Sequence, residues 1–446
     1  MTERPALTDD PLAADALADA LDFSFFDALA SRRSRRVGLG MATGGGVADY
    51  TSPYAPVPLS ESEEALLVFA ATGVVGMALG DLAHPDGLGA LVNWSSRAFP
   101  SPCNNQGTEL FFTNDEGTYF VDVPALVADP DEIAPAPPGD RAAQTERMLS
   151  LYRGARVQLD EGRADLPAGP PGLFNFNGWN ANRPGTTLFI PITDMTVEYL
   201  NVLFVYLDPT QRVALVDEAN GRRSAGLDRW VDSGRLDADR TMGIVTFEQR
   251  LLGIKATEAA FMTQNMAFAQ QAIGLGGFTF SAYNSQWVLG DMDNVGLGFR
   301  FATAADGARF PIGREGLYEA YVPEWYGDAH GAVQAFLDHK YSSYDPDVPK
   351  AFTDPQPVVD SAARPDEETV ELVTSYVDYV HRTFGRFPAY LDPMYMRIVS
   401  QAHHVDPDFY DEQNLAGALP PQMRDHMRRW HPEICDADGR PPRAEA

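Results

Sequence analysis

The fold of this chain depends most on one stretch, residues 256–277, which read ATEAAFMTQNMAFAQQAIGLGG. Apolar side chains recur through it at helical spacing, and it contains no proline. We predict a helix over Thr257–Ile273 that ends at Gly274, because glycine commonly follows the last turn of a helix. A helix that is apolar on nearly all sides should be deeply buried.

Further signals for regular structure lie N-terminal to this helix. Ser60-Glu61-Ser62-Glu63 has the spacing of a capping box, and an apolar run follows it, so a helix should begin there. A second short helix is expected over Phe23–Ser34, with Ser24 as its cap. Residues 38–58 contain glycines and prolines and are expected to form a loop.

Four segments have strand-like composition. Leu110–Thr113 and Gly117–Val123 are separated by the turn-forming residues 114–116, and Thr186–Ile192 and Val202–Leu207 are rich in β-branched and aromatic residues.

The chain of 446 residues is long for one domain. We divide it into an N-terminal arm (1–22), a main domain (23–330) and a helical C-terminal extension (331–446) that is disordered from about Asp436. Residues 126–240 form an insertion, with two proline-rich pieces around a helix near Asp140–Glu161. Helices are predicted in the extension over Ala332–Lys340, Glu367–Phe384, Pro393–His404 and Pro421–Trp430.

Charge and composition exclude several classes of function. The formal net charge is −29, which repels nucleic acid and anionic membranes. Two cysteines cannot form a disulfide framework or a thiol-rich zinc site. The sequence shows neither a signal peptide nor an apolar run of transmembrane length, so we expect a cytoplasmic protein.

Three local patterns could bind a phosphorylated, planar ligand. Arg32-Arg33-Ser34-Arg35-Arg36 offers guanidinium groups and a hydroxyl, which suit a phosphate. The loop at Pro100–Gln106 offers small and amide side chains, and Gly274-Leu275-Gly276-Gly277, after Gln264-Asn265, would let backbone pass close to a ring. Each pattern alone is equally compatible with a solvated basic patch, an ordinary loop or a helix cap.

Taken together and in this order, the patterns resemble the nitroreductase-like flavoprotein superfamily. The residues that carry the resemblance read RRSRR, PLSESEEALLVFAATG, RAFPSPCNNQGTELFFTNDEGTYFVD and ATEAAFMTQNMAFAQQAIGLGG. They are most similar to the branch of SagB-type dehydrogenases. FPIGREGLYEAYVPEW resembles a closing segment of some members, and the resemblance covers roughly residues 23–125 and 240–325.

The resemblance implies an α+β fold, in which helices wrap a mixed, mainly antiparallel sheet. It also implies a site for FMN that two subunits build together, and therefore a homodimer. Arg32, Arg33, Ser34 and Arg36 match positions that hold the FMN phosphate and ribityl chain. Leu275 and Gly276 match the turn near the isoalloxazine ring. Arg300 and Arg309 are candidates for a later basic pair in the family. The loop that reaches FMN from the partner subunit is matched by Pro100, Ser101, Pro102 and Asn104.

The implied activity is FMN-dependent hydride transfer at flavin N5 to or from a small molecule or a modified peptide. No GxGxxG motif opens a βαβ unit, so a reductant such as NAD(P)H would dock only transiently. No side chain is identified as catalytic. The alternative is a non-catalytic protein on the same scaffold, with or without flavin. The aromatic segment 174–180 could form a lid over the flavin or an ordinary packed loop.

The C-terminal region also concentrates histidines and acids. Imidazole with carboxylate is the composition of Zn, Fe or Mn sites, but no HExxH motif occurs, and Pro407 separates His404 from Asp408. Capped or hydrogen-bonded histidines at a helix end are the favoured interpretation, so no metal is predicted. One histidine lining the substrate pocket is an intermediate alternative. The residues concerned are His403, His404, Asp406, Asp408, Tyr410, Asp411, His426 and His431.

Overall fold

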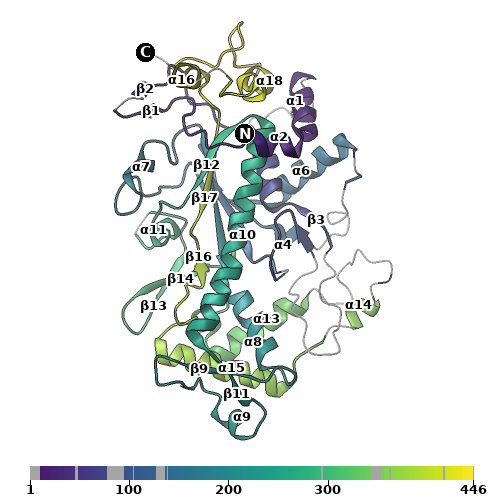
Figure 1. Ribbon diagram of the computed structural model, residues 1–446, viewed down its shortest axis with the longest axis vertical. Coiled ribbons are helices and arrows are strands. Elements are labelled where there is room, and N and C mark those ends of the chain that lie inside the picture. Colours follow the sequence, from purple (N-terminus) through teal and green to yellow (C-terminus); the bar gives the residue numbers. More distant parts are fainter. Residues whose placement is uncertain are drawn as a thin grey trace.

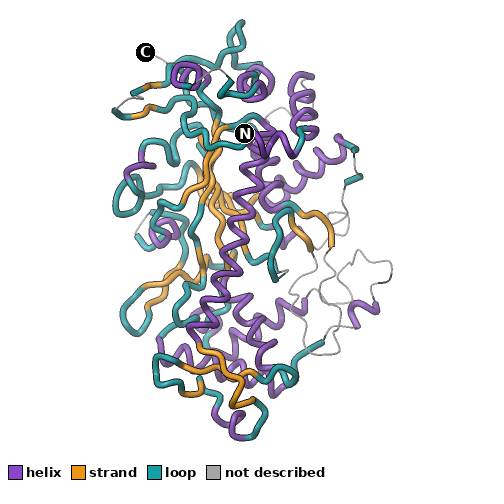
Figure 2. The backbone as a smooth tube through the Cα atoms, in the orientation of Figure 1, coloured by secondary structure: helices purple, strands orange, loops and turns teal. Residues whose placement is uncertain are grey.

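The computed structural model describes residues 11–45, 49–77, 95–103, 105–126, 136–137, 139–292, 295–342, 354, 356–360, 363–414 and 417–444. Its main feature is a seven-stranded sheet beside one long central helix (Figures 1 and 2). All strand pairings described in this sheet are antiparallel, which is compatible with the predicted fold class, although the sheet was expected to be mixed. The strands follow the order β12 (Gly276–Phe280), β17 (Val399–His403), β8 (Thr186–Asp194), β5 (Thr108–Thr113), β6 (Gly117–Val121) and β7 (Arg156–Glu161), and β16 (Met394–Tyr395) pairs with β8.

The central strands are buried on both faces, which explains their nearly continuous apolar sequence. In β5, Phe112 packs among the residues of one core and Phe111 among those of the other, as alternation along a strand requires. The first core is covered by α3 (Glu61–Thr72), α6 (Arg141–Ala155) and α10 (Ile244–Ile273). The second includes side chains of a smaller sheet, β13 (Arg300–Thr303), β14 (Arg309–Arg314) and β15 (Tyr318–Glu319).

The central helix α10 confirms the predicted helix and its end, but it starts earlier, at Ile244. Gly274 caps it with φ +97°, a left-handed conformation that favours glycine. The helix is not buried on all sides, because Phe261 is 38% exposed. One face of α10 therefore packs on the core, and another face is open to solvent.

Several predicted elements are confirmed. Ser60 and Glu63 form the capping box of α3, and the hairpin β5–β6 turns at residues 114–116. Helices α13 (Ala329–Ser342) and α15 (Glu367–Phe384) lie where they were predicted.

Other predictions of secondary structure are wrong. Val202–Leu207 belongs to helix α8 (Met195–Leu207), because the Asp194 side chain caps that helix and its apolar side chains are buried. Pro393–His404 contains strands β16 and β17 instead of a helix, and residues 156–161 form strand β7. The helix predicted over Phe23–Ser34 is shorter and forms α2 (Phe25–Ser31). The Ser24 side chain makes no capping hydrogen bond.

Residues from both sides of the proposed boundary at 330 share the main sheet, because β17 lies between β12 and β8. Strand β8 lies within the segment interpreted as an insertion. The domain division therefore stays a prediction. The expected disorder from Asp436 is wrong for the described residues, since Arg443 bridges to Tyr54 and the Ala444 N–H donates to the Pro53 carbonyl.

Smaller elements cover the two ends of the sheet (Figure 1). Near one end, α8, α13 and α15 pack together. Near the other, α1 (Pro11–Asp22) packs against the C-terminal helix α18 (His426–Trp430), and α16 (Pro407–Gln413) lies near β1 (Ala42–Thr43) and β2 (Tyr50–Thr51). Helix α17 (Pro421–Arg424) precedes α18 in the chain. The remaining elements are β3 (Val74–Met77), β4 (Ser95–Arg97), α4 (Val123–Leu126), α7 (Asn175–Gly178), β9 (Val213–Asp217), β10 (Arg223–Ser224), α9 (Asp228–Asp232), β11 (Asp237–Gly243), α11 (Ser285–Leu289), α12 (Pro323–Tyr326) and α14 (Gln356–Asp360).

Candidate functional site

Two of the three predicted ligand-binding segments meet in the structure. The Arg35 N–H donates to the Gly277 carbonyl at 3.1 Å, and the Gly277 N–H donates back to the Arg35 carbonyl at 2.9 Å. The Arg35 side chain is buried and donates to Gln271 Oε1 at 2.9 Å. The arginine segment therefore joins the edge of the main sheet at β12, directly after α10.

The aromatic segment also reaches this place. Arg36 donates to the Phe176 carbonyl at 2.9 Å and to Asn177 Oδ1 at 2.5 Å. Its guanidinium group lies 5.3 Å from the ring centroid of Trp179 and 4.8 Å from that of Phe278, within the range of cation–π attraction. Arg36 thus anchors the aromatic loop and is already engaged within the chain.

The other three polar residues of the arginine segment are open to solvent. Arg32, Arg33 and Ser34 follow the last turn of α2 and are exposed. Within the described ranges, neither arginine makes a hydrogen bond or an ion pair. Their guanidinium groups are therefore available to bind an anion.

The glycine turn is packed by the chain itself. A Cβ at Gly276 would lie 3.0 Å from His403 Nε2, and one at Gly277 would lie 2.2 Å from the Gln401 carbonyl oxygen. The Leu275 side chain is fully buried in the core. The glycines therefore let the Arg35 segment and β17 approach β12, a role that sequence analysis did not predict.

The third segment lies elsewhere in this chain. Ser101 Oγ donates to Glu258 Oε1 at 2.6 Å, beside the middle of α10. Glu258 precedes Ile273 by fifteen positions, so this contact lies about 22 Å along the helix from its C-terminal end. Pro100 and Pro102 are exposed, and Asn104 lies outside the described residues.

A buried polar network holds this loop in place. The Lys255 ammonium contacts Glu258 Oε1 at 2.6 Å, and Thr108 donates to the other oxygen of the same carboxylate at 2.8 Å. Burial raises the pKa of the neighbouring Cys103 thiol to about 12, so the thiol stays protonated. Neither arrangement points to a nucleophile in this loop.

A separate cluster joins the start of α3 to the C-terminal region. The Nε2 atoms of three histidines face the Glu63 carboxylate: His404 lies 3.1 Å and His426 2.6 Å from Oε1, and His431 lies 3.1 Å from Oε2. All four side chains are buried. Burial raises the pKa of Glu63, but the facing imidazoles, in their protonated form, lower it by more, so that this pKa lies well below its ordinary value.

The structure separates these histidines from the other residues of the C-terminal group. Tyr50 donates to Asp406 at 3.0 Å and Tyr54 to Asp408 at 2.8 Å, while Asp411 pairs with Arg424. His403 points to Gly38 and Gly276, away from the cluster. Glu63 was not among the predicted members of this group, because its position in a capping box already accounted for it.

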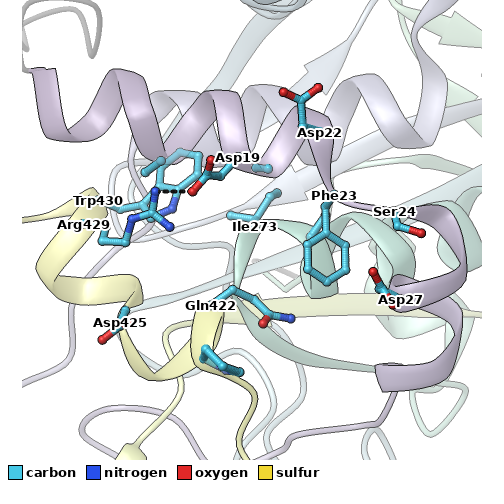
Figure 3. Close-up of a pocket in the computed structure, with 14 residues that line it drawn as sticks. Asp19, Asp22, Phe23, Ser24, Asp27, Ile273, Gln422, Asp425, Arg429 and Trp430 are labelled. Carbon is cyan, nitrogen blue, oxygen red and sulfur yellow. Dashed lines mark hydrogen bonds and ion pairs between the residues drawn. The ribbon is translucent and has the colours of Figure 1, made fainter.

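A cavity of about 480 Å³ lies where α1, α2 and the end of α10 meet α17 and α18 (Figure 3). Carboxylates of Asp19, Asp22, Asp27 and Asp425 line it, and Arg429 is paired with Asp19 at 2.6 Å. Ile273, in the same lining, accepts a hydrogen bond from His426 through its carbonyl. The acidic lining disfavours a phosphate in this cavity.

No family model matches the chain. No curated protein matches it either. Among solved structures, one similar protein is a provisionally described nitroreductase from Ralstonia eutropha JMP134, with 12% identity over 59% of this chain and 71% of that chain, at a TM-score of 0.27. Such a score is too low to establish a shared fold. In the described ranges, no helix has the length and hydropathy needed to cross a membrane.

Proposed function

We propose that this protein is an FMN-dependent oxidoreductase of the nitroreductase type, most similar to SagB-type dehydrogenases. The observation that carries the proposal is the pair of backbone hydrogen bonds between Arg35 and Gly277. Two segments 242 positions apart in the chain, each matched to the flavin site of the family, thereby lie side by side.

The residues around the contact between Arg35 and Gly277 differ in the part of FMN that they could bind. Arg32, Arg33 and Ser34 offer two free guanidinium groups and a hydroxyl for the phosphate. The exposed rings of Phe174 and Phe176 stack on each other at 5.5 Å between centroids and offer an apolar surface for a flavin ring. Leu275 and Gly276 would act only through their backbone, because their surroundings are packed.

Bound FMN would supply hydride acceptance at N5. The chain would hold the phosphate through Arg32, Arg33 and Ser34 and keep the aromatic loop in place through Arg36. The substrate class in this proposal is a small molecule or a modified peptide. A transiently docked NAD(P)H as reductant and a cytoplasmic location remain predictions.

A homodimer is part of the same proposal. Phe25, Phe26 and Leu29 on α2 are 59%, 74% and 49% exposed, and they lie beside α10, where Phe261 is also exposed. Phe25 contacts Phe268 of α10 with 5.4 Å between ring centroids, so the apolar surface is continuous across both helices. A second copy covering this surface would remove it from water. Light scattering of the purified protein should give the mass of a dimer.

The test of the proposed function is the flavin itself. The purified protein should be yellow, and mass spectrometry of the ligand released by denaturation should identify FMN. Arg32→Ala should weaken FMN binding by about 1.5–3 kcal/mol, the value of one charged hydrogen bond. Arg250→Ala is a matched control, because Arg250 is an exposed arginine of α10 outside this junction.

Two outcomes would contradict the proposal. Equal FMN affinity of wild type and Arg32→Ala would show that this segment does not bind the FMN phosphate. A colourless protein that gains no FMN on reconstitution would instead favour the non-catalytic alternative, an interaction protein on this scaffold.

A further inference from the structure

We propose that Glu63, His404, His426 and His431 form a closed zinc site that fastens the C-terminal region to the core. The four side chains come from three separate parts of the chain: the first turn of α3, the end of β17 and the segment around α18. One donor atom of each lies within 4.8 Å of the donor atoms of the other three. This inference does not depend on the proposed flavin site.

The hydrogen bonds of two histidines indicate which ring nitrogens face the carboxylate without hydrogen. His404 Nδ1 lies 2.9 Å from the Val57 carbonyl, and His426 Nδ1 lies 3.0 Å from the Ile273 carbonyl. A carbonyl oxygen only accepts, so both Nδ1 atoms must carry hydrogen. In the neutral rings, both Nε2 atoms then present lone pairs to the same oxygen of Glu63.

At this distance, an imidazole lone pair and a carboxylate oxygen repel each other unless a cation lies between them. A proton on each Nε2 would instead place positive rings side by side in a buried site, with 5.1 Å between the centroids of His404 and His426. One divalent ion satisfies all the lone pairs at once. The Nδ1–H to carbonyl bond is also the contact that orients histidine ligands in metal sites.

The spacing and the type of donors fit zinc. In a tetrahedral site with zinc–ligand distances of about 2.0–2.1 Å, neighbouring donor atoms lie about 3.3 Å apart. The three Nε2–carboxylate distances of 2.6–3.1 Å would widen by about 0.2–0.7 Å to reach this spacing. Four protein donors complete the tetrahedron and leave no open position, as in structural sites.

Further contacts fix the Glu63 carboxylate for this role. Ser60 donates to Glu63 Oε2 from its backbone N–H at 2.6 Å and from its hydroxyl at 2.7 Å. The capping box of α3 therefore also orients a ligand. Because His404 directly follows His403, which pairs with Gly276, the zinc would also fix the edge of the sheet where β12 meets β17.

The experiment measures zinc in the full-length protein, purified without chelators or a histidine tag. We expect close to one equivalent by elemental mass spectrometry, and cobalt added to the chelated protein should give the visible bands of a tetrahedral ion. His426→Ala with His431→Ala should lower zinc content at least tenfold. Two controls should retain zinc: His403→Ala, a buried neighbour outside the cluster, and His330→Ala, an exposed histidine of α13.

A second experiment uses the wild type, so that a loss of zinc cannot be caused by a variant that fails to fold. A strong chelator should lower its melting temperature, and zinc should restore it, while magnesium should not. A wild-type protein that contains no divalent metal and does not respond to zinc after chelation would overturn the proposal. Zinc retained at full equivalence by the double variant, shown to be folded by circular dichroism, would overturn it as well.

Discussion

Two adjacent glutamates in the first turn of α3 are both buried, yet their surroundings differ in kind. Glu64 accepts from Asn114, Tyr152 and Thr187, each at 2.7 Å, and all three are hydrogen donors. Glu63 faces three imidazole nitrogens, of which two carry lone pairs in the neutral ring. Burial raises the pKa of Glu64, whereas the pKa of Glu63 is lowered.

The difference shows that a buried charge alone does not indicate a ligand site. The carboxylate of Glu64 is satisfied by its own chain, and so is that of Glu109, which binds Arg97 through both oxygens at 2.6 Å. The surroundings of Glu63 are completed only by a cation. Counting donors against acceptors, not counting buried acids, therefore identifies the site.

The largest expected effect comes from truncating each glutamate in turn. Glu63→Ala should lower the free energy of unfolding by about 3–5 kcal/mol in the presence of zinc, because it removes one member of a buried charged cluster. Glu64→Ala should lower it too, by about 1–3 kcal/mol for each of the three donors that it leaves without an acceptor. Urea unfolding with zinc and with chelator provides the measurement.

The two variants should also differ in how they respond to the chelator. The effect of Glu63→Ala should shrink when zinc is removed, since the wild type then loses the same stabilisation. The effect of Glu64→Ala should be unchanged. Equal responses of both variants would erase the contrast between the two carboxylates.

A smaller effect is expected from pH at a third buried carboxyl, Asp194. Its Oδ1 accepts from the Thr196 N–H at 2.7 Å, and burial raises its pKa from 3.8 to about 6. The folded protein therefore holds this proton more tightly than the unfolded chain. The protonated Asp194 therefore stabilises the folded state by about 3 kcal/mol below about pH 3.8. This stabilisation is lost as pH rises through about 6.

Asp194→Asn is the variant that isolates this contribution, because asparagine can still cap α8 but does not titrate. The stability of the wild type relative to this variant should fall between about pH 4 and pH 7. Chemical unfolding at several pH values measures it. A constant difference across this interval would show that burial does not raise the pKa of Asp194.

The smallest expected effect is that of Ser60→Ala. Removal of the capping hydroxyl should cost about 1 kcal/mol. It should also weaken zinc binding by about 10–100-fold, because the hydroxyl orients the Glu63 carboxylate. Competition with a zinc-sensitive dye reports the second effect separately, and unchanged zinc affinity would restrict Ser60 to its capping role.

Local patterns predicted those elements whose stability is decided locally. The capping box of α3 and the glycine at the end of α10 are set by hydrogen bonds within a few residues, so sequence alone located both. Strand β17 was predicted as a helix because nothing near it in the sequence shows that it is inserted between β12 and β8. For α8, burial outweighed the β propensity of its side chains.

The central helix, the capping box and the order of the arginine, loop and glycine segments can be read from the residues alone. Which segments meet depends on the folded chain: Arg35 lies with Gly277, Ser101 with Glu258, and three C-terminal histidines with Glu63. The physical reason is that helix ends and turns depend on neighbours within one turn of backbone. A cluster of donors around one carboxylate depends on packing that joins residues more than 340 positions apart.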